Sequence, residues 1–433
     1  MQCNLKRSLR VPPCALCLRG VFVVAVLLFA LFFRAGALWL MSDALRTDPD
    51  GYRRLAVNLV EHGTFGQGDV PTAYRPPLYP MMLTGCVALG NCVRPAIGAL
   101  HVTLGAATVG LVFLLAEWWG LGRRGATIAA LLVACDPILL SQSAQVMTET
   151  TAVFFAAAGL AMLTCAARRP SGGQMFLTGV VLGLGSLCRP SLLPWAILAG
   201  VVFAWHILAW QWRRWTVKII LPASFFLGML LALAPWAVRN QLQFGRPILT
   251  TTHGGYTLLL ANNSSFYEWL RSGRWGDVWS AEGLTDGWNR RRPRDELAAD
   301  RAAYAEAITT IREQPGMFFY SCLVRLGRFW SPLAHQITPQ ESPLRRLSRW
   351  SAAAWYAAEF FLAALGCFAA AVWRGNTTTW LFGFLLVGCL MAGHAFYWTD
   401  MRMRAPIMPV IALAAAAGLT KKQRIIVSPE FEI

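Results

Sequence analysis

Ten apolar stretches, each close to the length that crosses a lipid bilayer, constrain this chain more than any other feature. A helix needs about 20 apolar residues to span the hydrocarbon core. Apolar residues make up 56% of the 433 and charged residues only 14%, a balance unusual for a soluble protein. We therefore expect an all-α, polytopic membrane protein with about ten transmembrane helices. The predicted spans are residues 18–40, 94–117, 126–145, 149–167, 174–191, 192–210, 217–237, 351–373, 379–398 and 406–419.

The distribution of basic residues predicts which loops face the cytoplasm. The formal charge of +17 includes only four lysines, which are Lys6, Lys218, Lys421 and Lys422. Ten spans place all four on one side of the membrane, together with the arginines of the short loops. Because basic loops stay in the cytoplasm, we expect both termini there. The positive charge then reports topology, and no nucleic-acid partner is expected.

Two longer polar segments divide the chain. Residues 1–240 are predicted to form a transmembrane module that includes a first exterior segment, 41–93. Residues 241–350 form a larger exterior loop with interfacial helices, and 351–433 form the C-terminal transmembrane helices. Residues 76–92 are apolar, but counting them as a span would reverse every later loop. We expect that segment to be a juxtamembrane helix on the outer face.

Acidic residues before a predicted helix form the first candidate site. Asp48 and Asp50 precede a helical pattern that begins at Tyr52. Aspartate is favoured at helix N-termini, so either carboxylate could be a cap. Alternatively, one of them is a general base that takes a proton from an acceptor hydroxyl. The two roles are compatible if the acids differ.

Arginines at the outer ends of spans form the second candidate site, because they run against the positive-inside tendency. They could reach lipid headgroups, or they could form a permanently charged clamp on a phosphate. These arginines are Arg34, Arg75, Arg189, Arg239, Arg402 and Arg404.

Two acids at span level have structural alternatives. Glu149 begins a span on the outer side and could simply be a first-turn acid. Asp136 precedes Pro137, and we expect a kink residue whose carboxylate is paired internally. The histidines are scattered and the one CxxC pair, Cys14 and Cys17, has no second pair, so neither a metal nor another cofactor is expected.

A set of short motifs occurs in the order in which one superfamily has them. The first exterior segment contains Asp48-Pro49-Asp50-Gly51-Tyr52 and Arg75-Pro76-Pro77-Leu78-Tyr79-Pro80. The later motifs are Met147-Thr148-Glu149, Leu187-Cys188-Arg189-Pro190, Pro235-Trp236 with Arg239-Asn240, His253-Gly254-Gly255 with Asn262-Asn263, and Arg402-x-Arg404. This set resembles the GT-C membrane glycosyltransferases, in the branch of the protein O-mannosyltransferases and the lipid A aminoarabinose transferase.

The resemblance implies a GT-C-like bundle and an inverting enzyme that moves a sugar from a polyprenyl-phosphate donor to an acceptor hydroxyl on the non-cytoplasmic face. The family's base lies four residues before the tyrosine, which corresponds to Asp48; Asp50 is the alternative, because it replaces an acid that usually follows directly. The donor phosphate is assigned to Arg75, Arg189, Arg239, Arg402 and Arg404. Substrate contacts are assigned to Tyr52, Tyr79, Glu149 and Asn262.

Two other functions compete with this interpretation. A transporter or flippase of a lipid-linked saccharide would place its ionisable residues at mid-span, whereas here they gather at the outer rim. An inactive relative that acts as an assembly partner is the third alternative. We expect a bacterial inner (plasma) membrane, with membrane lipids around the protein. The sugar stays open, as does the acceptor, which could be a glycan, a lipid or a protein.

Overall fold

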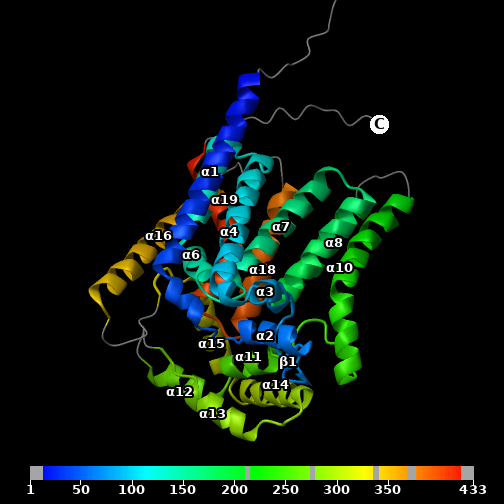
Figure 1. The fold of residues 1–433 in the computed structure, drawn as a ribbon, viewed down its shortest axis with the longest axis vertical. Helices are drawn as coiled ribbons and strands as arrows, with labels where there is room; N and C mark the ends of the chain where they lie inside the picture. The colour runs from blue at the N-terminus through cyan, green and yellow to red at the C-terminus, as the bar shows by residue number, and fades with distance from the viewer. Residues whose placement is uncertain (1–12, 210–214, 274–277, 335–340, 369–376, 421–433) are drawn as a thin grey trace, which may run out of the picture.

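The computed structural model describes residues 13–209, 215–273, 278–334, 341–368 and 377–420, and nearly all of its regular structure is helical. In this part of the chain, eight helical runs are long and apolar enough to cross a membrane. They contain α1 (Pro13–Leu40), α4 (Val93–Trp118), α7 (Glu149–Arg168), α9 (Leu193–Ala209), α10 (Trp215–Phe244), α16 (Pro343–Phe368), α18 (Thr377–Phe396) and α19 (Met408–Leu419). The expected all-α, multi-pass membrane fold is confirmed (Figure 1).

Each of the ten predicted segments is helical, but two of them are not full straight spans. α5 (Gly122–Cys135) and α6 (Pro137–Ser143) meet at a bend of 50°, and together they count as a possible ninth span. α8 (Gly172–Cys188) is apolar but has only 17 residues. Pro137 explains the bend because proline cannot continue the hydrogen-bond ladder of a helix.

Asp136 has the structural role expected for it. Its carboxylate caps α6, since Oδ1 accepts from the N–H of Leu139 at 2.8 Å and from the Tyr356 hydroxyl at 2.9 Å. Arg34 holds the same bend from α1, donating to the carbonyls of Val133 and Leu139 and to the Ser143 hydroxyl. The bend is therefore stabilised by hydrogen bonds from side chains of α1 and α16.

The shorter elements gather at one end of the bundle, which we call the loop end (Figure 1). α3 covers the apolar segment after the first exterior loop and is too short to cross a bilayer, as expected. The elements up to α4 are η1 (Ser42–Arg46), α2 (Tyr52–His62), β1 (Gly66–Gln67), β2 (Val70–Pro71), α3 (Leu78–Val87) and η2 (Gly90–Cys92). The two strands pair antiparallel, with Gly66 opposite Pro71.

The 241–350 segment folds into further helices at the loop end. These are α11 (Gly254–Ala261), α12 (Ser264–Ser272), α13 (Glu282–Arg291), α14 (Glu296–Glu313) and α15 (Pro315–Trp330). Two short 3₁₀ turns, η3 (Pro190–Leu192) and η4 (Met401–Ile407), introduce α9 and α19. Both turns lie directly beside arginines that the sequence singles out.

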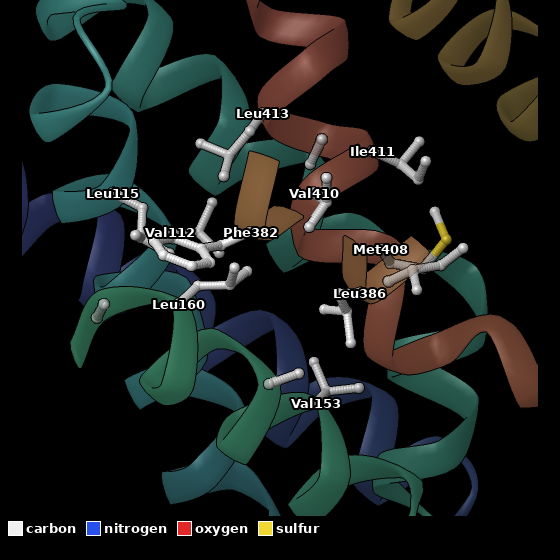
Figure 2. Close-up of a cluster of buried hydrophobic side chains, with 14 of the residues drawn as sticks. Val112, Leu115, Val153, Leu160, Phe382, Leu386, Met408, Val410, Ile411 and Leu413 are labelled. Carbon is white, nitrogen blue, oxygen red and sulfur yellow. The ribbon is translucent and has the colours of Figure 1, made fainter. Parts of the chain in front are cut away.

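Close packing of small and branched residues holds the spans together. Side chains of α4, α7, α18 and α19, including Val112, Leu160, Phe382 and Val410, form a continuous buried cluster (Figure 2). α8 packs so tightly on α10 that a Cβ added to Gly179 would lie 1.9 Å from the Phe225 carbonyl oxygen. Small residues allow such approaches between membrane helices, and they fix the ends of the helices that present the site.

Candidate functional site

The turn before α2 orients two carboxylates. Gly51 adopts φ +73°, a left-handed conformation suited to glycine, and starts the helix. Asp48 Oδ2 accepts from the backbone N–H of Arg54 at 2.9 Å. Its other oxygen, Oδ1, is buried and has no hydrogen-bond partner in the described chain. One oxygen of the Asp48 carboxylate thus caps the start of α2, and the other is held in place without a partner among the described residues.

Asp50, from the same turn, forms an ion pair with Arg75. Nη2 of Arg75 lies 3.0 Å from Oδ1 of Asp50, with both side chains mostly buried. The Arg75 guanidinium also lies 5.5 Å from the ring centre of Tyr52 and 5.4 Å from that of Tyr74. Cation–π contact of this kind holds the guanidinium in place without neutralising it.

A second ion-pair cluster joins three other elements. Glu149, at the first turn of α7 and 2% exposed, lies 3.4 Å from Nη1 of Arg189 and 3.8 Å from Nε of Arg402. Arg189 sits at the break between α8 and η3, and Arg402 lies in η4, where Asp400 also pairs with it at 3.1 Å. Thioethers supply further partners, Met403 to Arg189 and Met147 to Arg402.

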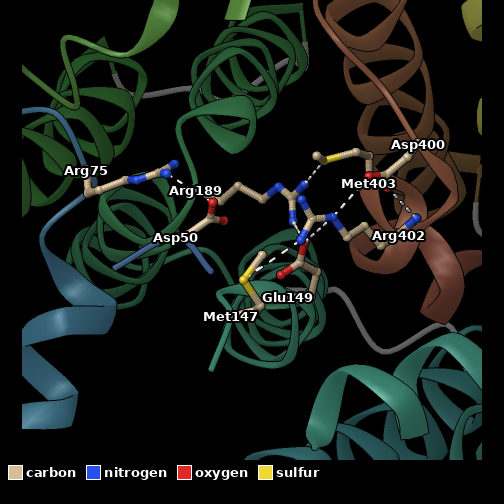
Figure 3. A network of polar contacts seen from close by, with 8 residues as sticks. All are labelled: Asp50, Arg75, Met147, Glu149, Arg189, Asp400, Arg402 and Met403. Carbon is tan, nitrogen blue, oxygen red and sulfur yellow. Dashed lines mark hydrogen bonds and ion pairs between the residues drawn. The ribbon is translucent and has the colours of Figure 1, made fainter. Parts of the chain in front are cut away.

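The two groups of charges lie next to each other. Figure 3 shows Asp50 between Arg75 and the Glu149–Arg189 pair. We call this set the polar centre; it consists of Asp50, Arg75, Glu149, Arg189 and Arg402. Segments as distant as 50 and 402 are thereby brought together at the loop end. The predicted contact residue Tyr52 adjoins the centre, and its ring meets that of Tyr79 edge-on at 5.4 Å.

Four other predicted residues direct their polar atoms elsewhere. Arg239 donates to the carbonyls of Phe65 and Thr72. Arg404 is fully buried, and its Nη1 donates to the carbonyls of Phe329 and Ser331. Its Nε and Nη2 have no hydrogen-bond partner among the described residues, and the guanidinium lies 4.2 Å from the ring centre of Tyr356.

The remaining two are also engaged within the protein. The amide of Asn262 bonds to the carbonyls of Leu258 and Phe396. The Tyr79 hydroxyl lies 2.9 Å from Nε2 of His101. The structure does not bring Arg239, Arg404 or Asn262 into the polar centre, and substrate contact by these three stays a prediction.

A cavity of about 810 Å³ opens beside Asp50 and Arg75. One wall comes from the first exterior segment and the other from α13, α14 and the chain between them. Its lining includes Arg54, Tyr74, Thr252, Tyr256, Trp288, Asn289, Arg292, Arg294, Glu296 and Asp300. Sequence reasoning assigned no role to the basic run at 290–294.

Glu296 is a residue that sequence reasoning missed. Oε1 accepts from the N–H of Ala73 at 2.8 Å and from the Thr252 hydroxyl at 2.5 Å, and Oε2 accepts from the Thr72 hydroxyl at 2.5 Å. It therefore fixes the segment that leads directly into Arg75. An acid in the first turn of a helix is common, so the sequence carried no signal for this role.

Burial keeps the neighbouring rings neutral. Burial, together with the positive charge of Arg75, lowers the pKa of His253 to about 3. Burial raises the pKa of Tyr74 to about 12, although Arg75 opposes the shift. Near pH 7 the charges around the cavity and the polar centre are therefore those of carboxylates and guanidinium groups. No group of three or more His, Cys, Asp or Glu side chains that could hold a metal occurs in the described ranges.

Comparisons with known proteins agree with the fold. Residues 74–244 match the family model of dolichyl-phosphate-mannose-protein mannosyltransferases. The apo oligosaccharyltransferase of Archaeoglobus fulgidus superposes with a TM-score of 0.53 at 16% identity, over 92% of this chain and 50% of that one. This chain thus spans half the length of that protein.

ArnT from Cupriavidus metallidurans, bound to undecaprenyl phosphate, superposes with a TM-score of 0.43 at 17% identity, over 92% of this chain and 77% of that one. None of the curated protein sequences compared with the chain matches it. Residues 74–244 thus resemble that mannosyltransferase family, and the chain shares its fold with the archaeal oligosaccharyltransferase.

Proposed function

We propose that this protein is an inverting glycosyltransferase that moves a sugar from a polyprenyl-phosphate donor to an acceptor hydroxyl on the non-cytoplasmic face of the membrane. The observation that carries the proposal is the polar centre, where Asp50 and Glu149 pair with three arginines at the loop end, beside the turn that also carries Asp48. The match to a family named for a dolichyl-phosphate-mannose donor supports a lipid-phosphate sugar as donor.

The arginines suit a phosphate leaving group. The side chains of Arg189 and Arg402 donate to no backbone carbonyl among the described residues, and their partners are carboxylates and thioethers. Because a thioether is a weak acceptor, guanidinium donors remain for phosphate oxygens. In the reaction the bond between the anomeric carbon and the phosphate oxygen breaks, and polyprenyl phosphate leaves with the electron pair. Guanidinium groups stabilise that anion without supplying a proton.

A carboxylate suits the acceptor side. As the acceptor oxygen bonds to the anomeric carbon from the face opposite the phosphate, its proton passes to a carboxylate oxygen. Oδ1 of Asp48 is oriented, buried and without a partner, which favours Asp48 as the base. Asp50 is the alternative, since it borders the cavity, although its Oδ1 is already paired with Arg75.

The charge distribution supports a site on the non-cytoplasmic face, with both termini in the cytoplasm. Arg123 and Arg124 at the start of α5, Arg168 at the end of α7 and Lys218 near the start of α10 lie at helix ends remote from the polar centre. Basic ends of this kind stay in the cytoplasm, which leaves the loop end outside.

A donor screen with purified protein tests the proposal. A panel of polyprenyl-phosphate sugars is offered with an acceptor mixture, and released polyprenyl phosphate is measured. We expect Asp48→Asn to lower turnover by about 10²-fold or more, with unchanged thermal unfolding, and Asp50→Asn to act less strongly. Asp43→Asn is the matched control, because Asp43 lies in the same segment and pairs with Arg46 on the surface.

The outcomes separate the assignments. Full turnover in Asp48→Asn with loss in Asp50→Asn would move the base to Asp50. Turnover retained in both variants would reject a carboxylate base at this turn. Arg75→Ala is expected to raise the donor concentration needed for half-maximal rate, and an unchanged donor dependence would reject Arg75 as a phosphate contact.

A further inference from the structure

The cavity is lined by Asp50 and Arg75, but not by Glu149, Arg189 or Arg402. Its far wall is formed by α13 and the start of α14, which lie at the end of the molecule away from the spanning helices (Figure 1). A ligand in this cavity therefore arrives from water, whereas a lipid-linked ligand arrives between the spans. The cavity and the Glu149–Arg189–Arg402 cluster thus suit different reactants.

The acids of the cavity are already engaged by the protein. Glu296 accepts three hydrogen bonds from Thr72, Ala73 and Thr252. Asp300 accepts from the N–H of Gly255 at 2.7 Å, and Asp50 pairs with Arg75. These carboxylates therefore have little capacity left for a ligand.

Three of the arginines that line the cavity, in contrast, have side chains without a partner in the described part of the chain. The side chains of Arg54, Arg292 and Arg294 have no hydrogen bond or ion pair with any residue that the structure describes, although all three line the cavity. Arg291, the last residue of α13, shows the contrast, since it pairs with Glu306. The charge that the cavity offers to a ligand is therefore positive, and it comes in the forked form that suits carboxylate and phosphate.

The remaining lining suits a saccharide. Tyr74 and Tyr256 contribute ring surfaces, and Gln67 and Asn289 contribute side-chain amides that can both donate and accept. A volume of about 810 Å³ lies in the range of small-ligand sites. That size suits a few sugar units.

We infer that the cavity holds the acceptor and that this acceptor is a saccharide carrying a carboxylate or phosphate group. The inference rests on the proposed function, because the acceptor hydroxyl must reach the carboxylates of the α2 turn. The anionic group lies toward Arg292 and Arg294, and the reacting hydroxyl lies toward the turn that carries Asp48 and Asp50.

Equilibrium binding without any donor tests the inference. The probes are a fluorescent trisaccharide ending in a uronic acid, the same trisaccharide ending in a neutral hexose, and an acidic decapeptide, each followed by anisotropy with the full-length protein in detergent. We expect the acidic trisaccharide to bind about tenfold more tightly than the neutral one, as a charged hydrogen bond provides. Arg292→Gln or Arg294→Gln should remove most of that difference.

Arg290→Gln is the matched control, because it removes the same charge two residues before Arg292, near the end of α13, at a residue that does not line the cavity. Equal binding of the acidic and neutral trisaccharides would overturn the inference, as would an equal loss in Arg290→Gln and Arg292→Gln. A decapeptide that binds as tightly as the acidic trisaccharide, and through Arg292, would replace the saccharide with a peptide acceptor.

The test is separable from that of the proposed function. Asp48→Asn should bind the acidic trisaccharide like the wild type, since Asp48 does not line the cavity. If no donor supports transfer but the acidic trisaccharide binds through Arg292, the glycosyltransferase proposal fails while the anionic saccharide site stands. If transfer occurs to neutral acceptors at full rate, the proposed function stands and the anionic acceptor is rejected.

Discussion

Two groups of charged side chains lie within this bundle, and their arginines have different partners. Around the bend between α5 and α6, Arg34 donates to backbone carbonyls and a serine hydroxyl, and Arg404 donates to carbonyls below η4. In the polar centre, Arg189 and Arg402 face a shared carboxylate and two thioethers.

The difference separates structural charges from available ones. A guanidinium that satisfies backbone carbonyls stabilises the fold, and its removal leaves those carbonyls buried without a donor. A guanidinium whose partners are weak or ionic can exchange them for a phosphate. Arg402 and Arg404 are two residues apart in one motif, yet they belong to different groups. We therefore expect substitutions to have opposite consequences in the two groups.

The largest effect is expected from the pair Arg402→Gln and Arg404→Gln. Arg402→Gln should lower the transfer rate by about 10²–10³-fold, as loss of a transition-state charge partner does, with little change in thermal stability. Arg404→Gln should instead destabilise the fold by about 1–3 kcal/mol for each carbonyl left without a donor. Initial rates and thermal unfolding in detergent measure both. A rate loss without destabilisation in Arg404→Gln would place that arginine in the site and contradict the division into structural and available arginines.

A smaller effect is expected from Glu296→Gln, which sharpens the comparison by testing how the polar centre is held. Glutamine replaces one acceptor oxygen with an N–H₂ group, so one of the three donors around Glu296 loses its partner. The segment leading to Arg75 should shift and turnover should fall by about tenfold or more. Glu306→Gln, which removes only the surface pair with Arg291, is the control and should change little.

For Glu296→Gln, the kinetic constants and the amount of folded protein distinguish a role in positioning Arg75 from a role in stability alone. A rise in the donor KM with kcat less affected would indicate a displaced Arg75. An equal fall in folded protein and activity, with kcat and KM per folded molecule unchanged, would show that Glu296 serves stability alone.

The smallest effect concerns His253, which lies beside Tyr74 and Arg75. Because its pKa is lowered to about 3, it stays neutral between pH 5 and pH 8, so His253→Asn should leave the shape of the pH–rate profile unchanged there. The unfolded chain binds a proton at this residue below about pH 6.5, so the residue lowers stability as pH falls from there toward 3. A profile that loses an inflection near pH 6.5 in His253→Asn would contradict a neutral imidazole.

Much of the fold could be predicted from local composition, because a span needs only a sufficient apolar length. The prediction of a kink at Asp136 followed from one proline, and its carboxylate is paired internally as expected. The number of full-length spans was predicted less accurately than the fold class. α8 is slightly too short and α5–α6 is bent, and both outcomes depend on neighbours such as Arg34 and on the packing against α10.

The candidate site could be predicted in part, through arginines and acids at the outer ends of spans. The sequence could not separate Arg402 from Arg404. Both lie in the 3₁₀ turn η4, where each residue rotates the side-chain direction by about a third of a turn, so residues two apart face different neighbours. It also left the roles of Asp48 and Asp50 open, and it was silent on Glu296, whose partner Thr72 is 224 residues away.

The sequence by itself determined that this protein is a helical membrane bundle with charged motifs at one end, because hydrophobic length and basic loops act locally along the chain. Only the tertiary structure decided which charges are used to hold the fold and which remain free to meet a ligand. The physical reason is that a guanidinium's availability depends on the acceptors within hydrogen-bonding distance, and at this site those acceptors come from segments that only folding brings together.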